Sequence, residues 1–200
     1  MKAAPSAPAS PGRELIPELE ARRREFREAA EEVRGLYAGL TETQLSWRPE
    51  PGRWSIAECL DHLNVTGEEI LKFVNGAVER GWARGTTGSP PFRYGWLGDW
   101  FVRAIGPSNA RKMPAPRLYR PREDLRVSAV LPEFLDLQEA LVAALERANG
   151  LDLARVRARS PVTPLLRIGV GQWFSAVAGH QVRHLRQTRA VREHPSFPHA

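Results

Sequence analysis

Cysteine is almost missing from this sequence: Cys59 is the only one in 200 residues. A lone thiol cannot form a disulfide within the chain, and it has no second thiolate with which to build a zinc site. Any metal ion would therefore be held through nitrogen or oxygen atoms. Cys59 would act as a nucleophile only with a lowered pKa, and a small buried side chain is the better interpretation.

Long apolar runs are also missing. No segment approaches the roughly 18 uninterrupted apolar residues of a membrane-spanning helix. The opening segment MKAAPSAPASPG has a lysine but not the continuous apolar core of a signal peptide, and its composition is typical of a flexible tail. We therefore expect a cytoplasmic protein with no membrane contact and a flexible tail over residues 1–12.

A third absence is a block of cations. The net charge is +6, yet the segment EARRREFREAAEEVR mixes both signs along one predicted helix. Basic side chains interleaved with aromatic ones, the usual sign of a nucleic-acid surface, are not found. We therefore favour a solvated arginine-rich surface over a nucleic-acid partner. Nucleic-acid binding through that surface is the alternative, and it would depend steeply on salt.

Apolar residues recur at helical spacing in four long segments. These segments cover residues 13–39, 55–79, 132–150 and 169–193. Ser55 and Glu58 form a capping-box pattern at the start of the second segment. Pro132 suits the first turn of the third, and Gly150 suits its end. No alternating strand pattern competes, so the sequence predicts an all-α fold.

The middle two segments are separated by a long crossover, residues 81–131, in which YGWLGDWFVRAIG predicts a short helix. Such a connection indicates a four-helix bundle that is not simply up-down-up-down. We expect one bundle domain over residues 13–193 and a C-terminal tail over residues 194–200. The aromatic residues of the crossover either shape an apolar pocket or pack into the core. They are Tyr94, Trp96, Trp100 and Phe101.

The stretch GHQVRHLRQ near the C-terminus contains two histidines on one helix face. His180 and His184 lie one turn apart, about 40° in projection, so both can reach one ion. His62, on the second predicted helix, lies on a face that is apolar apart from selected polar residues. Three neutral imidazoles would hold a divalent ion with an open position, as in a catalytic site. A hydrogen-bonded core or surface pair is the alternative, and His194 and His199 are expected to be solvated.

Three further residues are candidates for catalytic roles. Glu58 could orient a ligand or exchange protons, although the cap with Ser55 is the favoured role. Glu69 lies two turns beyond His62 and would be a base only if it were aimed at the core. A surface carboxylate is the favoured interpretation. Gln187 could hydrogen-bond a ligand histidine or a substrate, or make a polar contact between helices.

The segment LSWRPEPGRWSIAECLDHLNVTGEEI, followed far downstream by GHQVRHLRQ, resembles the DinB-like (YfiT-like) family of metalloenzymes. The matching residues are Leu45, Trp47, Pro49, Trp54, Ser55, Glu58, His62 and Leu63 in the first motif and His180, His184 and Gln187 in the second. The resemblance implies an up-down-down-up four-helix bundle, a three-histidine site for a divalent metal ion, and frequent homodimers. Relatives include transferases that use a low-molecular-weight thiol and metal-dependent hydrolases.

These observations together predict a metal-dependent enzyme that activates a thiol or water for attack on a small-molecule electrophile. The resemblance favours a transferase over a hydrolase, and Arg183 gives weak support because it could attract an anionic thiol. Nitrogen ligands suit zinc, nickel, iron or copper without choosing among them. The alternative is a non-catalytic protein that binds a metal ion or a small molecule on the same bundle.

Overall fold

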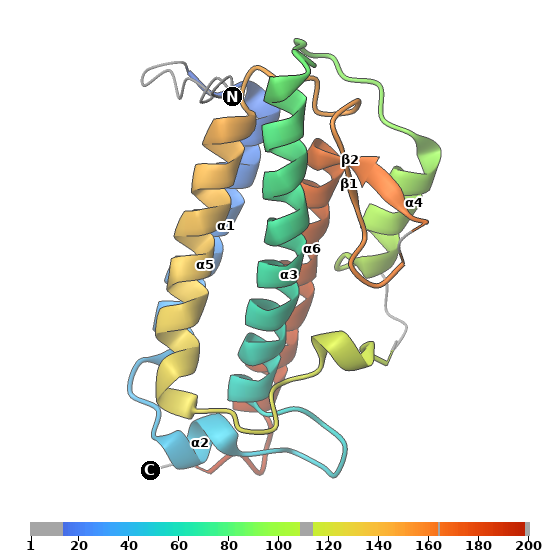
Figure 1. Ribbon diagram of the computed structural model, residues 1–200. Coiled ribbons are helices and arrows are strands. Elements are labelled where there is room, and N and C mark those ends of the chain that lie inside the picture. The colour runs from blue at the N-terminus through green and yellow to red at the C-terminus, as the bar shows by residue number, and fades with distance from the viewer. Residues whose placement is uncertain (1–13, 109–113, 164, 199–200) are drawn as a thin grey trace, which may run out of the picture.

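Four long helices form the molecule: α1 (Pro17–Tyr37), α3 (Ile56–Ala83), α5 (Val127–Ala148) and α6 (Val170–Arg192). The computed structural model describes residues 14–108, 114–163 and 165–198. The helices confirm the predicted all-α four-helix bundle (Figure 1). The tail expected over residues 1–12 and the predicted environment of His199 lie outside the described residues.

The bundle has up-down-down-up topology. In Figure 1, α1 and α6 run downward from their N-terminal ends, whereas α3 and α5 run upward. Helix α3 packs against α5 and α6, and α1 packs against the same two helices. Because α3 and α5 are parallel neighbours, the chain must return along the length of the bundle between them. The described residues 84–108 and 114–126 belong to this return, and they contact α6 and α3 on the way.

Two clusters of buried apolar side chains fill the interior. The first includes Phe26, Leu141, Trp173 and Phe174, and the second includes Val33, Leu60, Phe134 and Leu185. Each fully buried large apolar side chain contributes roughly 1.5–3 kcal/mol to folding, so helix packing is the main source of stability. Within the described ranges, no helix is both long enough and apolar enough to cross a membrane.

Helix α3 begins where the sequence predicted. The Oγ of Ser55 accepts a hydrogen bond from the Glu58 N–H at 3.2 Å, and a Glu58 carboxylate oxygen accepts one from the Ser55 N–H at 2.9 Å. This reciprocal pair satisfies N–H groups that the first turn of a helix leaves without partners. The cap therefore fixes the first residue of α3. It thereby also fixes the position of His62, two turns further on, along the axis of the bundle.

The start of α5 corrects the sequence prediction. The helix begins at Val127, five residues earlier than expected, and Pro132 lies inside it. Proline has no N–H, so the helix loses one backbone hydrogen bond there. Burial of Val130 and Phe134 in the second cluster favours continuing the helix through the proline. The expected glycine does follow its end, where Gly150 has a φ of 105°.

Three small elements outside the crossover were not predicted. Helix α2 (Glu42–Ser46) is a single turn with its own capping box from Thr41 and Gln44. Strands β1 (Arg157–Arg159) and β2 (Arg167–Gly169) pair antiparallel and add a small hairpin to the otherwise helical fold. Elements of three to five residues are too short for hydrophobic periodicity to become visible. All three lie in connections between the long helices.

The crossover contains the predicted short helix, α4 (Trp96–Ile105), followed by a 3₁₀ turn, η1 (Arg117–Tyr119). Phe101 packs on Trp173 with ring centroids 5.4 Å apart, so it belongs to the core. Trp96 and Trp100 remain 78% and 55% exposed, so they do not pack into the core. The aromatic residues of this helix therefore divide between the core and the surface.

The segment after α6 folds back onto α2. Phe197 is buried, and the Gln44 side-chain amide donates a hydrogen bond to the Pro198 carbonyl at 2.8 Å. His194 is half-buried, with its ring 5.4 Å from that of Trp47, so the prediction of a solvated His194 is wrong. The turn after the helix brings this imidazole against the tryptophan.

Candidate metal centre

The structure brings His62, His180 and His184 together between α3 and α6. One ring nitrogen from each histidine lies within 4.8 Å of the others, and Nε2 of His62 is 3.0 Å from Nε2 of His180. The ring centroids are 4.5–5.1 Å apart. The sequence predicted that these three side chains converge, and they do. Their role as metal ligands stays a prediction.

Two features of the fold produce this meeting. His180 and His184 are four residues apart on α6 and therefore project from neighbouring turns of one face. Helix α3 packs antiparallel to α6, and its cap at Ser55 sets His62 at the same height in the bundle. His62 and His184 are buried, whereas His180 is partly exposed. The cluster thus lies inside the bundle.

The crossover orients His62 through a backbone group. Nδ1 of His62 contacts the carbonyl oxygen of Tyr119, at the end of η1. A carbonyl can only accept a hydrogen bond, so Nδ1 must donate, and Nε2 keeps its lone pair toward the other two rings. Histidines that bind metal ions commonly show this pattern. No side-chain motif encodes it, and the length of the crossover was the sole signal in the sequence.

Trp54 forms one wall of the centre. Its ring lies 4.8 Å from the ring of His62 and 6.0 Å from that of His184, measured between centroids. Trp54 is half-buried and directly precedes the cap residue Ser55. The indole therefore limits the rotation of two imidazoles and shields them on one side.

Burial and mutual repulsion keep the three imidazoles neutral. Burial lowers the pKa of His62, despite the opposing hydrogen bond to Tyr119. Burial first, and then the neighbouring His62, lower the pKa of His180 to about 3. For His184, burial and then His180 lower the pKa to about 2. At neutral pH all three rings therefore offer lone pairs, which is the protonation state that a metal ion requires.

The donor set fits a divalent cation. Nε2 of His62 and Nε2 of His180 face each other at 3.0 Å inside the cluster, and two neutral rings that meet in this way crowd their lone pairs together. Leaving buried polar atoms without partners is costly, as is placing three imidazoles together. A cation bound by the lone pairs that converge on the centre would remove part of both costs. Imidazole nitrogen suits zinc, copper, iron and nickel, and the identity of the ion stays a prediction.

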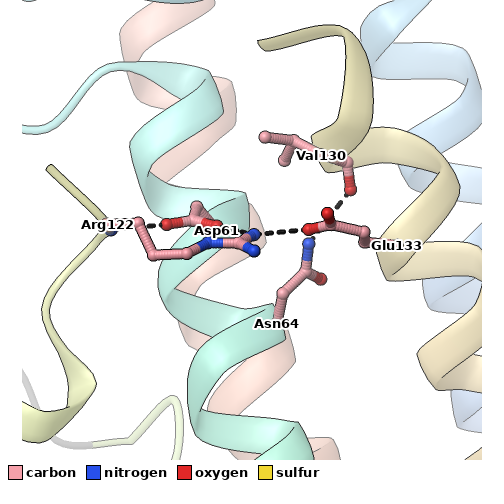
Figure 2. A network of polar contacts seen from close by, with 5 residues as sticks. All are labelled: Asp61, Asn64, Arg122, Val130 and Glu133. Atoms are coloured by element: carbon pink, nitrogen blue, oxygen red, sulfur yellow. Dashed lines mark hydrogen bonds and ion pairs between the residues drawn. The ribbon is translucent and has the colours of Figure 1, made fainter. Parts of the chain in front are cut away.

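A polar network that the sequence analysis missed holds the end of the crossover (Figure 2). Asp61, fully buried on α3, accepts hydrogen bonds from the Arg122 backbone N–H and Nε–H, both at 2.7 Å. The same guanidinium pairs with Glu133 on α5. Arg122 lies three residues after Tyr119, so the network ties the turn that contacts His62 to two bundle helices. Asp61 directly precedes His62, which is a signal that was available in the sequence.

Two of the predicted catalytic candidates are occupied elsewhere. The Glu58 carboxylate caps α3 and binds the guanidinium of Arg48 with both oxygens. Glu69 forms an ion pair with Lys72 at 2.5 Å on the outside of α3. Neither acid contacts the three histidines in the described structure. The favoured structural interpretation of each residue agrees with these contacts.

Gln187, the third candidate, interacts with one of the three histidines, whereas Cys59 is a buried thiol. Gln187 lies one turn after His184, close enough for its amide to raise the pKa of that ring slightly against the larger effect of burial. Nδ1 of His184 nevertheless lacks a partner of standard geometry. Cys59 is fully buried, and burial raises the pKa of its thiol. The predicted inert role of Cys59 fits this environment.

These features define an all-α bundle protein with a three-histidine centre between its second and fourth long helices. Residues 19–188 match the model of the DinB superfamily, and the chain belongs to this superfamily. The family predicted from the two motifs is thus confirmed.

Two relatives from Bacillus subtilis illustrate the match. The chain is 25% identical over 169 residues to the uncharacterized protein YuaE of strain 168, covering 84% of this chain and 95% of YuaE. Its fold is similar to that of YfiT, with a TM-score of 0.60, 13% identity and 94% of both chains covered. YfiT is described as "a probable metal-dependent hydrolase with an unusual four-helix bundle topology". At this identity the likeness to YfiT shows the fold.

Proposed function

We propose that this protein is a metal-dependent enzyme that activates water or a thiol for attack on a small-molecule electrophile. The observation that carries the proposal is the set of three neutral imidazoles within 4.8 Å of one another. Structural zinc sites are closed by four protein ligands, whereas catalytic sites use three and keep a position for water or substrate. His62, His180 and His184 are the three ligands in this proposal.

The residues of the chain prepare the centre for this chemistry. The Tyr119 carbonyl holds the proton of His62 on Nδ1, which leaves Nε2 free to bind. Trp54 excludes water from one side of the rings, and His180 is the one member of the three that keeps partial exposure as a residue. A bound divalent ion would supply Lewis acidity and lower the pKa of a coordinated water or thiol.

Hydrolysis and thiol transfer are supported by different observations. The description of YfiT as a metal-dependent hydrolase supports activation of water. Arg183 supports an anionic thiol, because its positive charge acts on both His180 and His184 and would attract an anion to the centre. We retain transfer of a low-molecular-weight thiol as the preferred reaction. Homodimerisation and a cytoplasmic location stay predictions.

Metal removal and restoration test the proposal. The protein is stripped with a chelator, reloaded with zinc, nickel or iron, and assayed with activated esters and with thiols plus small electrophiles. We expect turnover only in a reloaded sample, and none in a His184→Ala variant. A His194→Ala variant serves as the matched control, because His194 contacts Trp47 outside the centre. Turnover that survives chelation would contradict metal dependence, and bound metal without turnover would favour the non-catalytic alternative.

A further inference from the structure

A groove lined by arginines lies between the C-terminal end of α3 and the β1–β2 hairpin. Two adjoining hollows, of about 110 and about 410 Å³, share Arg80, Arg84 and Arg167 in their walls. Arg155 and Arg157 complete the first hollow, and Arg159 completes the second. We call these six residues the arginine groove. They come from three separate segments, so the sequence alone does not show that they meet.

Several of these arginines are placed as like-charged neighbours. Arg80 lies in the last turn of α3 and Arg84 is the C-cap residue four positions later, and Arg159 lies directly opposite Arg167 across the hairpin. Like charges at helix spacing i,i+4, or opposite each other on paired strands, destabilise the fold. All six side chains are exposed, so core packing does not require them. The Arg159–Arg167 pair therefore opposes stability, whereas the C-terminal end of α3 favours the two cations placed there.

No acid compensates this charge in the part of the chain that the structure describes. None of the six arginines forms an ion pair or a side-chain hydrogen bond there, whereas Arg22, Arg23 and Arg34 on α1 each pair with a glutamate. Asp152 is the acid nearest in sequence to the hairpin, and its Oδ1 accepts from the backbone N–H groups of Ala154 and Arg155. The groove thus keeps its positive charge for a ligand.

We propose that the arginine groove binds the phosphate chain of a nucleoside di- or triphosphate. Guanidinium groups match phosphate with two parallel hydrogen bonds, and several in one hollow match a compact polyanion. The larger hollow has the size of a small-molecule site. Phe73, 39% exposed, lines it and offers an aromatic face to a base. A nucleic-acid strand would need a longer basic track than one helix end and a hairpin.

This site is distinct from the metal centre. Arg80 follows His62 by 18 residues on the same helix, which corresponds to about 27 Å along the helix axis. A nucleotide in the groove would therefore not touch the three histidines. The proposal stands on the groove alone and does not depend on the proposed reaction.

Calorimetric titration tests the groove with ATP as the probe, at physiological ionic strength. We expect saturable binding that weakens at least about tenfold in the Arg159→Ala/Arg167→Ala variant, because two charge-assisted contacts are removed. The matched control is Arg24→Ala/Arg27→Ala on α1, which removes the same charge from exposed positions elsewhere. Its affinity for ATP should equal that of the unmodified protein. If the hairpin variant does not fold, Arg80→Ala/Arg84→Ala replaces it.

Three comparisons complete the test. The His184→Ala protein should bind ATP with the same affinity as the unmodified protein. If ATP instead bound at the metal centre, this variant would lose the binding. ATP should bind more tightly than inorganic triphosphate, and Phe73→Ala should remove the difference. Equal weakening in the groove and control variants, or no ATP binding, would overturn the proposal. A single-stranded oligonucleotide of about ten nucleotides that binds the groove much more tightly than ATP would overturn it in favour of nucleic acid.

Discussion

At the scale of single residues, the chemistry of the centre depends on which ring nitrogen of His62 carries the proton. The carbonyl of Tyr119 decides this, since it accepts only from Nδ1–H. Nδ1 of His184 is buried and lacks a partner of standard geometry. His62 is therefore the ring that is oriented in advance, with the lone pair of its Nε2 directed toward the ring of His180. Two predictions belong to this scale.

The first concerns Glu58, which caps α3 and pairs with Arg48. Glu58→Gln keeps the capping-box geometry and loses an ion pair worth about 0–1 kcal/mol. We expect a small loss of stability and no change in metal affinity. Ser55→Ala, which removes the cap, should cost about 1 kcal/mol. Chemical denaturation and metal titration measure both effects. A large loss of metal affinity in Glu58→Gln would show that this acid serves the centre.

The second concerns pH. The pKa of His184 is about 2 in the folded protein and rises to its ordinary value of 6.5 on unfolding. The unfolded chain therefore binds more protons between these values, and stability of the metal-free protein falls as the pH drops below 6.5. One fully linked histidine gives a slope of about 1.4 kcal/mol per pH unit. His184→Gln should flatten the decrease between about pH 7.5 and 5.

Urea denaturation in the presence of a chelator measures this slope for both proteins. The pH range ends at about 5 because carboxylates begin to titrate below it. Within this range the histidines therefore dominate the pH dependence of stability. An equal slope in the two proteins would mean that His184 is not held neutral by burial.

At the scale of elements, the crossover connects the bundle topology to the site. Parallel packing of α3 and α5 requires a long return, and η1 within that return supplies the contact to His62. The Asp61–Arg122–Glu133 network fixes the end of η1 to α3 and α5 (Figure 2). The network should therefore affect both stability and metal binding.

The Arg122→Leu variant tests the effects on stability and on metal binding, and a second substitution separates them. The change leaves the fully buried Asp61 without its cation and should cost about 2 kcal/mol, less than a wholly buried pair because Arg122 is 40% exposed. Metal affinity should fall about tenfold as the Tyr119 carbonyl loses its support. Adding Asp61→Asn should restore part of the stability but not the affinity.

Glu133→Gln is the matched control, because this carboxylate is nearer to solvent and its loss leaves the pair with Asp61 intact. We expect little change in either quantity. Unaltered metal affinity in Arg122→Leu, measured by competition with a chelating dye, would show that the network does not position His62.

The extent of the sequence prediction also becomes clear at this scale. Long amphipathic helices and the cap at Ser55 were predictable, because periodicity and capping residues encode them locally. The turn at η1 and the pairing of β1 with β2 were not, since three-residue elements carry no periodic signal. The early start of α5 was missed because burial of Val130 outweighs the local effect of Pro132.

At the scale of the whole molecule, the bundle carries two features at different heights. The histidine centre lies near the start of α3, and the arginine groove lies near its end. The convergence of His62 with His180 and His184 could be predicted for two reasons. The three residues lie on helix faces that point toward the core, and burying imidazoles without partners is costly. The groove could not, because the positions of Arg80, Arg157 and Arg167 relative to one another depend on the packing of a hairpin against α3.

The central claim is that three histidines from two helices bind one divalent ion. Elemental analysis of the purified protein, with His62→Ala and His194→Ala in parallel, tests it most directly. We predict about one metal ion per chain in the unmodified protein and in His194→Ala, and loss of the ion in His62→Ala with helix content retained. Stoichiometric metal retained in folded His62→Ala would contradict the claim, as would an unmodified protein that binds no divalent metal when it is supplied.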